Sequence, residues 1–134
     1  MSESEDVYRT LILRLPAFTY IVAYEKERPT AQMPIYFSPQ AVEVSGYAVE
    51  EWLADTQLWA KIIHPEDQGR VVAETWRTTL EDVPYLTRYR IVRKDGTIAH
   101  VLEKSELAHE ATRDVWYGLI IEIGERESGL PPAE

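Results

Sequence analysis

Two short apolar runs near the start of the chain predict a pair of β-strands. Residues 18–24 are aromatic, β-branched or small, and such residues favour extended structure. Residues 35–37 form the second run, which Ser38-Pro39 ends because proline cannot donate a backbone hydrogen bond. Between the two runs, the charges and two prolines of residues 25–34 predict an exposed loop.

Helical patterns occupy the middle of the chain. Apolar positions in residues 40–59 are interrupted by Gly46, which predicts several short helices rather than one long helix. The run His64-Pro65-Glu66-Asp67 is typical of a helix start, with proline at the first helical position and acids in the first turn. We therefore expect a longer helix from residue 65 to about 80, with an apolar stripe formed by Val71, Val72, Thr75, Trp76 and Thr79.

The last third of the chain reads as three strands. Residues 85–93 and 97–108 flank Asp95-Gly96, a tight-turn dipeptide that predicts a β-hairpin. After a polar loop, residues 115–123 form the most apolar run. Because the helices are segregated from the strands, we expect an α+β fold, with a five-stranded antiparallel sheet and short helices on one face.

The two ends of the chain differ from its middle. Residues 1–15 start polar and acidic and then place apolar side chains at near-helical spacing, which predicts a leading helix with one apolar face, made by Val7, Leu11 and Leu15. The closing residues are rich in glycine and proline and predict a linker. The expected organisation is an N-terminal segment and helix over 1–15, one domain over 16–127 and a linker over 128–134.

Composition excludes several classes of protein. The net charge of -9 disfavours nucleic acid as a partner, because neutralising phosphates needs clustered Lys and Arg. No apolar run approaches the roughly 20 residues that span a bilayer, and the acidic start lacks the basic residues of a signal peptide. We expect a cytoplasmic protein without membrane insertion. The absence of cysteine excludes disulfides, thiolate nucleophiles and Cys-ligated zinc.

Five local motifs follow one another in a fixed order. They are Ile-Tyr-Phe-Ser-Pro-Gln at 35–40, Val-Ser-Gly-Tyr with Glu-Glu-Trp-Leu within 44–53, Ile-His-Pro-Glu-Asp at 63–67, Tyr-Arg-Ile-Val-Arg-Lys-Asp-Gly at 89–96, and a Gly118 strand that exits through Glu122-Ile123-Gly124-Glu125-Arg126. In this order they resemble the motifs of PAS domains, and the His-Pro-Glu-Asp and Arg-Lys-Asp-Gly runs resemble one subgroup of that family.

The resemblance implies a sensory module that binds a small ligand or a protein partner and relays its state to an output domain, such as a histidine kinase or a cyclic-dinucleotide enzyme. It also implies a homodimer, for which Val7, Leu11 and Leu15 are the candidate interface. The candidate relay residues are Glu122, Ile123 and Gly124. The family's light-sensing flavin branch carries a reactive cysteine that residues 55–59 lack, so its flavin-thiol photochemistry is excluded.

A ligand of such a domain is expected between the sheet and the short helices. Strand alternation chooses the inward-facing residues, and the helices add the opposite wall. The candidate pocket residues are Val44, Trp52, Leu53, Trp59, Tyr89, Ile91, Val101, Glu103, Gly118 and Ile120. The alternative is that these side chains pack on one another without a ligand, which leaves a dimerisation or protein-interaction scaffold.

Glu103 stands out because a carboxylate on an inward face is costly unless it is paired. It is a candidate anchor for a ligand amine or hydroxyl. Two other placements remain open, one at the strand end in solvent and one in an ion pair with Arg88 or Arg90. A register slip of one residue would point it outward.

No catalytic or metal site emerges from the sequence. His64, His100 and His109 share no ligand-like spacing, and the helix from residue 65 to 80 contains no histidine, which disfavours haem. No nucleophile elbow or phosphate-binding glycine loop occurs. We therefore expect a domain that is not an enzyme. The competing interpretation is a small cone-shaped α+β enzyme, with Glu103 or Asp95 as a base beside Tyr89.

Overall fold

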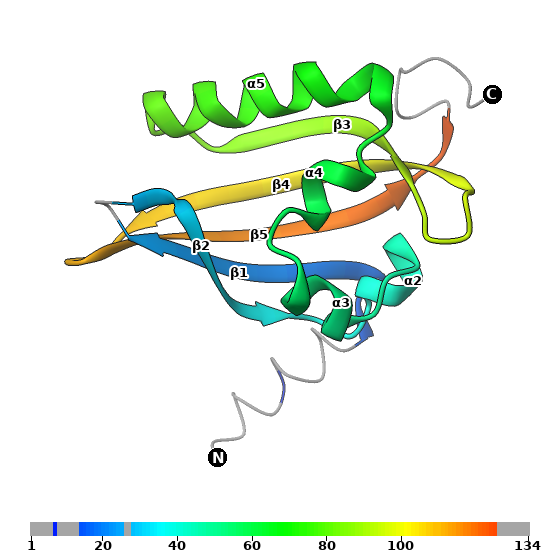
Figure 1. Ribbon diagram of the computed structural model, residues 1–134, viewed down its shortest axis with the longest axis horizontal. Coiled ribbons are helices and arrows are strands. Elements are labelled where there is room, and N and C mark those ends of the chain that lie inside the picture. The colour runs from blue at the N-terminus through cyan, green and yellow to red at the C-terminus, as the bar shows by residue number, and fades with distance from the viewer. Residues whose placement is uncertain (1–6, 8–13, 26–27, 126–134) are drawn as a thin grey trace.

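A computed structural model describes residues 7, 14–25 and 28–125 (Figure 1). Its five strands form one antiparallel sheet with the order β2-β1-β5-β4-β3. The strands are β1 (Ala17–Glu25), β2 (Arg28–Phe37), β3 (Tyr85–Val92), β4 (Ile98–His109) and β5 (Arg113–Ile123). The first and last strands of the domain therefore lie side by side in the middle of the sheet, and β2 and β3 are its edges.

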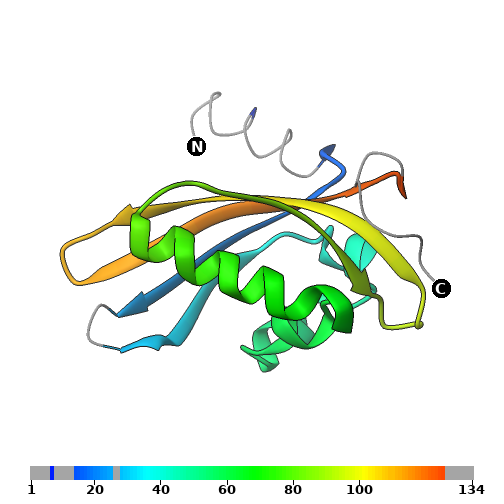
Figure 2. The same cartoon turned by 90° about the horizontal axis from the view of Figure 1, so that it is seen from above.

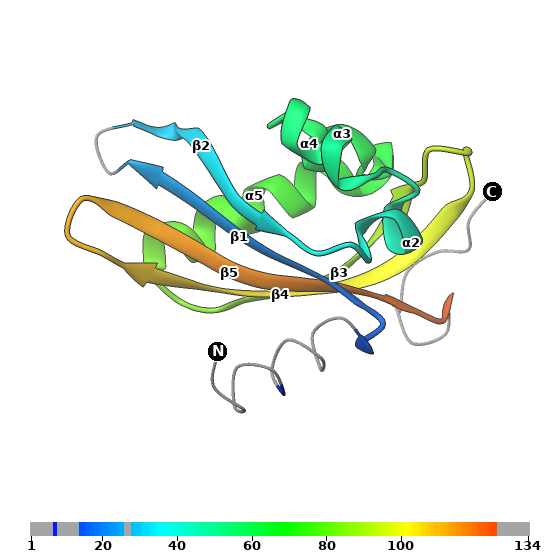
Figure 3. The same cartoon turned by 90° about the horizontal axis from the view of Figure 1, so that it is seen from below.

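The described helices all lie on one side of the curved sheet, as Figures 2 and 3 show. They are α2 (Ala41–Ser45), α3 (Val49–Ala54), α4 (Leu58–Ile62) and α5 (Pro65–Glu81). The predicted fold class, a five-stranded antiparallel sheet with short helices on one face, is confirmed. No helix in the described ranges is long and apolar enough to cross a membrane.

One prediction about the second strand is wrong. Residues 25–34 were expected to form a loop, whereas β2 begins at Arg28 and pairs with β1 along its length. Two prolines are tolerated because β2 is an edge strand, where one side of the backbone needs no partner. Pro34 also lies at a register shift, since Ile21 pairs with Tyr36 while Val22 pairs with Pro34.

The long helix α5 starts where the sequence predicts. His64 is the N-cap, and its Nδ1 accepts a hydrogen bond from the backbone N–H of Glu66 at 3.1 Å. The helix ends at Glu81, and its C-cap residue Asp82 adopts a left-handed conformation with φ of 55°. Within the predicted apolar stripe Val71 is fully buried, but Trp76 is half exposed and does not belong to the core.

A buried ion pair joins the start of α5 to the edge strand β3. The guanidinium of Arg90 donates to both carboxylate oxygens of Asp67, at 2.9 and 2.8 Å, and the Arg90 backbone N–H donates to Asp67 as well. Both side chains are almost fully buried. The His-Pro-Glu-Asp and Tyr-Arg motifs therefore contact each other, which sets the position of α5 above β3.

The core lies between the helices and the concave face of the sheet. It is built around Phe18, Trp52, Ile63, Val71, Tyr89 and Val101. Phe18 packs edge-on against Trp52 with ring centroids 5.0 Å apart. These contacts hold α3 against β1, the strand that also carries Tyr20 into the site described below.

Two predicted segments lie largely or wholly outside the described residues. The leading helix over 1–15 falls mostly on residues that the structure does not describe, including Leu11, although Val7 and Leu15 are described and are about half exposed. The linker over 128–134 also lies outside the described part of the chain.

An aromatic cavity as the candidate functional site

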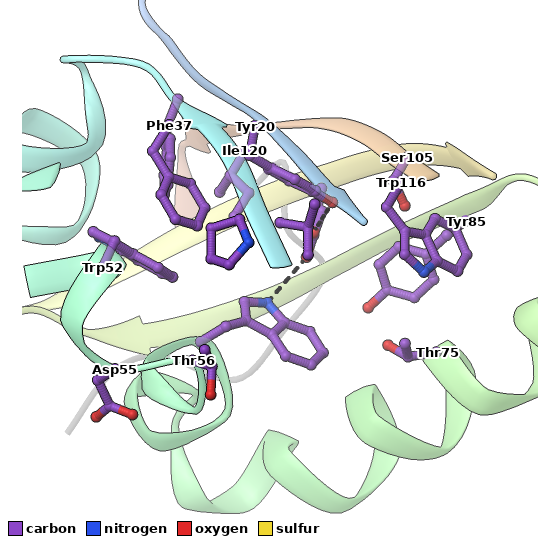
Figure 4. A pocket seen from close by; sticks show the side chains of 15 residues that line it. Tyr20, Phe37, Trp52, Asp55, Thr56, Thr75, Tyr85, Ser105, Trp116 and Ile120 are labelled. Carbon is purple, nitrogen blue, oxygen red and sulfur yellow. Dashed lines mark hydrogen bonds between the residues drawn. The ribbon is translucent and has the colours of Figure 1, made fainter. Parts of the chain in front are cut away.

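A cavity of about 120 Å³ lies between the sheet and helices α3, α4 and α5 (Figure 4). Seven aromatic side chains line it, together with three aliphatic and five polar residues. The wall consists of Phe18, Tyr20, Val22, Pro34, Phe37, Trp52, Asp55, Thr56, Trp59, Thr75, Tyr85, Glu103, Ser105, Trp116 and Ile120. For scale, an engineered apolar cavity of about 150 Å³ holds one benzene molecule.

Glu103 is a buried carboxylate within this wall, only 4% exposed. Its Oε2 accepts a hydrogen bond from the Tyr20 hydroxyl at 2.5 Å. Its Oε1 accepts from the Tyr89 hydroxyl at 2.6 Å and from the indole Nε1 of Trp59 at 3.2 Å. The same indole also donates to the Tyr89 hydroxyl at 3.0 Å. Three strands and α4 therefore meet at one carboxyl group.

The electrostatics of this network follow from burial. Burial raises the pKa of the Glu103 carboxyl, although the hydrogen bonds from Tyr20, Tyr89 and Trp59 act in the opposite direction. Burial and the neighbouring Glu103 charge also raise the pKa values of Tyr20 and Tyr89 well above their ordinary value. Both phenols therefore stay protonated at neutral pH and remain hydrogen-bond donors.

Gly118 makes room for the Tyr20 ring. The two residues pair directly across β1 and β5. A Cβ atom added at Gly118 would lie 2.3 Å from the Tyr20 hydroxyl and 2.4 Å from its Cζ. Only glycine lets the ring lie over β5 and reach Glu103, so Gly118 shapes the site without lining it.

The far end of the cavity carries hydroxyl groups. Tyr85 is 2% exposed, and its hydroxyl has no hydrogen-bond partner of ordinary geometry within the described ranges. Burial and the charge of Glu103 raise its pKa far above the ordinary value, whereas Thr75 acts to lower it. Figure 4 shows Tyr85 close to Thr75, Ser105 and Trp116. A buried polar atom without a partner is rare, which makes this hydroxyl a candidate contact for a bound molecule.

The structure divides the predicted pocket residues other than Gly118 into three groups. Trp52, Trp59, Glu103 and Ile120 lie in the cavity wall. Buried residues behind the wall are Val44, Tyr89, Ile91 and Val101, and Tyr89 contacts the wall through its hydrogen bonds. The prediction for Leu53 is wrong, because its side chain is 50% exposed on α3, where the preceding residue, Trp52, turns inward instead.

The alternatives for Glu103 are also decided. It does not lie in solvent, and it does not pair with Arg88 or Arg90, because Arg90 is engaged by Asp67 and Glu66. The sequence alone did not identify five other residues of the cavity wall, one on each strand. They are Tyr20 on β1, Phe37 on β2, Tyr85 on β3, Ser105 on β4 and Trp116 on β5. Alternation along β1 could have found Phe18, Tyr20 and Val22, since these every-second residues share one face.

The candidate relay residues lie at the exit of β5. Arg93, on the turn between β3 and β4, donates one hydrogen bond to the Val44 carbonyl at 3.1 Å and pairs with the Glu122 carboxylate. Ile123 lies opposite His100 at the end of the β4–β5 pairing, and Gly124 follows directly. Helix α2 and the exit of β5 are therefore linked through one side chain.

The three histidines lie apart. His64 caps α5, His100 is buried on β4, and His109 is half exposed between Asp82 and Asp114. In the described part of the chain, no three His, Asp or Glu side chains gather as they do around a metal ion.

Comparison with known proteins agrees with this architecture. The model of the PAS fold family matches residues 34–119. The methyl sulfide methyltransferase-associated sensor of Methanosarcina acetivorans is 26% identical over 97 residues, which is 70% of this chain. The chain spans about 10% of the length of that relative.

Solved structures share the fold. The N-terminal domain of a diguanylate cyclase with PAS/PAC sensor from Marinobacter aquaeolei superimposes with a TM-score of 0.67 at 20% identity, covering 81% of this chain and 98% of that one. A sensory box histidine kinase/response regulator from Burkholderia thailandensis superimposes with a TM-score of 0.63 at 17% identity, covering 90% and 86%.

Because the family model covers more than half of the chain, the chain belongs to the PAS fold family. It is a sensory signal-transduction module. PAS domains are sensory modules, and the structure from Marinobacter aquaeolei is the N-terminal domain of a diguanylate cyclase rather than the whole enzyme.

Proposed function

We propose that this PAS domain senses a small ligand that binds in the aromatic cavity, and that it passes the bound state to an output domain. The observation that carries the proposal is the cavity itself, with its aromatic wall and, at one end, the buried Tyr85 hydroxyl, which has no hydrogen bond of ordinary geometry within the described ranges. Concave, largely apolar sites with a few convergent polar groups are where small molecules bind. Output domains of the histidine kinase or cyclic-dinucleotide type are supported by the sensor proteins that share the fold.

The proposed relay uses the contacts of Arg93. A ligand changes the balance between two states only if it binds one of them better. A molecule in the cavity would contact Trp52 on α3, and the preceding helix α2 offers its Val44 carbonyl to Arg93. Because Arg93 also pairs with Glu122, a shift of α2 would be felt at Glu122, Ile123 and Gly124.

A second candidate is a scaffold that dimerises or binds a protein partner without a ligand. The observation in its favour is that Glu103 already has hydrogen-bond donors from Tyr20, Tyr89 and Trp59, so the carboxylate needs no ligand. The cavity of about 120 Å³ is also smaller than the roughly 300 Å³ at which drug-sized pockets begin.

The experiment that separates the two is native mass spectrometry of the purified protein. A stoichiometric added mass supports a ligand-binding sensor, and an apo spectrum with the mass of a dimer favours the scaffold. Ile120→Phe adds a ring to the cavity wall and is expected to remove the added mass. Leu119→Phe is the matched control, because Leu119 is next to Ile120 in β5 and its side chain points to the opposite face of the strand.

Several finer properties belong to the same proposal. We infer membership of the PAS subgroup marked by His-Pro-Glu-Asp and Arg-Lys-Asp-Gly, which the contact between Asp67 and Arg90 supports. The domain is proposed to act in the cytoplasm, as a homodimer, and without catalytic activity of its own. The arrangement around Glu103 supports this last point, because the carboxylate is occupied by donors from the protein rather than presented as a free base.

A further inference from the structure

The ionisable side chains of the cavity wall include acidic residues but no basic ones. The wall contains two carboxylates, Glu103 and Asp55, and no Lys, Arg or His. Asp55 is neutralised at the edge of the site by Lys61, whose Nζ lies 2.8 Å from its carboxylate. Glu103 forms no ion pair with any Lys, Arg or His of the described ranges, and its partners are two phenols and an indole, all uncharged. The Glu103 carboxyl group is therefore hydrogen-bonded but has no charged partner among the described residues.

The rest of the wall is rich in aromatic rings. Trp52, Trp59 and Trp116 are joined by Tyr20, Tyr85 and Phe37 from three strands. Figure 4 shows Phe37 and Trp52 on one side of the cavity and Tyr85 and Trp116 on the other. The face of an aromatic ring attracts cations, tryptophan most strongly, and cages of such rings recognise quaternary ammonium groups.

We propose that the cavity binds a small organic cation, an alkylammonium or quaternary ammonium ion, with the rings around its apolar substituents and Glu103 as the buried counter-charge. This inference rests on the proposed ligand-binding function and names the chemical class of the ligand. An inorganic cation does not fit, because it needs a shell of oxygen ligands and the wall is mostly carbon. An anion does not fit either, since it would meet an uncompensated carboxylate.

The hydroxyl end of the cavity adds a second requirement. Tyr85 is buried, its hydroxyl has no hydrogen bond of ordinary geometry within the described ranges, and Thr75 and Ser105 line the same end. A ligand that carries a hydroxyl group a few atoms from its charged nitrogen would satisfy Tyr85 while its cationic end contacts the rings. Choline has this combination of groups and is therefore the probe of choice.

The first test compares choline with 3,3-dimethylbutan-1-ol, the uncharged molecule of the same shape in which carbon replaces nitrogen. Binding to the purified domain is followed by isothermal titration calorimetry and by tryptophan fluorescence, since three of the four tryptophans line the cavity. Choline is expected to bind at least about tenfold more tightly than the uncharged molecule, because it alone gains the cation–π and charge interactions. Tetramethylammonium is expected to bind too, but more weakly, because it lacks the hydroxyl group.

The second test removes the counter-charge. Glu103→Gln keeps the size of the side chain, and we expect it to abolish the preference for choline over the uncharged molecule. Glu106→Gln is the matched control, because Glu106 lies on the same strand and is exposed; it is expected to leave the preference unchanged. Thermal unfolding of both variants checks that each is folded. If Glu103→Gln does not fold, the comparison of the two probes on the unaltered domain still decides the matter.

A pH series on the unaltered domain gives a third readout. Burial raises the pKa of Glu103, and binding of a cation favours its ionised form, so choline affinity should fall as the pH falls through that pKa. The other titratable groups at the cavity do not contribute to this pH dependence of choline affinity. Tyr20, Tyr85 and Tyr89 have raised pKa values and stay neutral, and hydrogen bonds from Lys61 and Gln57 keep the pKa of Asp55 low.

Each remaining outcome overturns the cation proposal in a recognisable way. Equal binding of choline and 3,3-dimethylbutan-1-ol, or binding of the uncharged molecule alone, would show a sensor for neutral ligands and leave the proposed function standing. If neither cation binds at millimolar concentration while native mass spectrometry finds a bound molecule, the cation class is wrong but the cavity is a ligand site. If neither cation binds and no molecule is found, both proposals fail together.

Discussion

A residue of this domain can position the side chains of the cavity either by leaving room for them or by forming hydrogen bonds with them. Gly118 is the clearest case, because its missing side chain is what allows Tyr20 to reach Glu103. Ser45 shows the opposite behaviour. Its hydroxyl is buried, donates to the Ala41 carbonyl at 2.6 Å and accepts from the indole of Trp52 at 3.1 Å, so one small side chain orients a cavity-lining ring.

Gly118→Ala is expected to destabilise the domain by about 1–3 kcal/mol, the usual effect of overpacking a filled core. The added methyl group would displace the Tyr20 ring and break its hydrogen bond with Glu103. Urea unfolding measures the change. Gly69→Ala on α5 is the control, because the added Cβ would lie within 4 Å of no atom beyond its chain neighbours and its own helix backbone; there alanine should stabilise the helix by up to about 1 kcal/mol. Equal effects of the two substitutions would contradict this account of Gly118.

His109 is expected to titrate above its ordinary range. Hydrogen bonds with Asp114 and Asp82, at 2.7 and 2.9 Å, raise its pKa. A histidine whose folded pKa is raised stabilises the protein fully below its unfolded pKa of about 6.5. That contribution is lost as the pH rises through the folded value. An NMR titration of the imidazole measures the pKa, and Asp82→Asn should lower it; a pKa at or below the ordinary value would disprove the arrangement.

At the scale of elements, the domain is joined by side-chain bridges between segments that are distant in the chain. Arg90 ties α5 to β3. Arg93 ties the β3–β4 turn to α2 through the Val44 carbonyl and to β5 through Glu122, and Lys94 ties the same turn to α3 through Glu51. Helices α2, α3 and α4 are too short to be stable alone. Their positions, and with them one wall of the cavity, therefore depend on these bridges and on packing against the sheet.

Asp67→Ala is expected to destabilise the domain by about 3–5 kcal/mol, because it leaves the Arg90 guanidinium buried without its main partner. Glu66→Gln is the control. Glu66 also contacts Arg90, at 3.2 Å, but its side chain is 68% exposed, and exposed pairs contribute at most about 1 kcal/mol. Chemical denaturation compares the two variants, and a loss for Glu66→Gln as large as that for Asp67→Ala would refute the role given to burial.

At the scale of the whole molecule, the arrangement of the sheet places the first and last strands of the domain next to each other. Strands β1 and β5 are neighbours, so the segment that enters the domain and the segment that leaves it meet at the same part of the sheet. The cavity lies on the helix-covered face, and Tyr20 and Ile120 bring both central strands into its wall. If the cavity binds a ligand as proposed, the ligand would contact both of these central strands directly.

The proposed homodimer gives a prediction at this scale. If the apolar positions of residues 1–15 pair with a second copy, Leu15→Glu should lower the dimer fraction, because it places a charge in an apolar contact. Leu80→Glu is the control, since Leu80 is 81% exposed on α5, on the helical side of the sheet. Analytical ultracentrifugation measures both variants. A dimer that survives Leu15→Glu but is lost in Leu80→Glu would place the interface on α5 instead.

The sequence by itself determined the elements and their order. The sequence predicted correctly those features that depend on residues close together in the chain, such as the helix start around Pro65 and the tight turn at Asp95-Gly96. They failed for β2, because the stabilising partner of an edge strand lies in β1 and the prolines of the segment are unfavourable only in a central strand.

Only the tertiary structure decided how the site is composed. Alternation placed Glu103 inward, but which groups it meets depends on the strand order, which puts β1 next to β5 and so brings Tyr20 within reach. The same holds for Leu53 and Trp52, since a short helix can turn either neighbour inward and packing against Phe18 selects Trp52. Sequence patterns report periodicity within an element, whereas a cavity is formed by side chains from elements that meet only after folding.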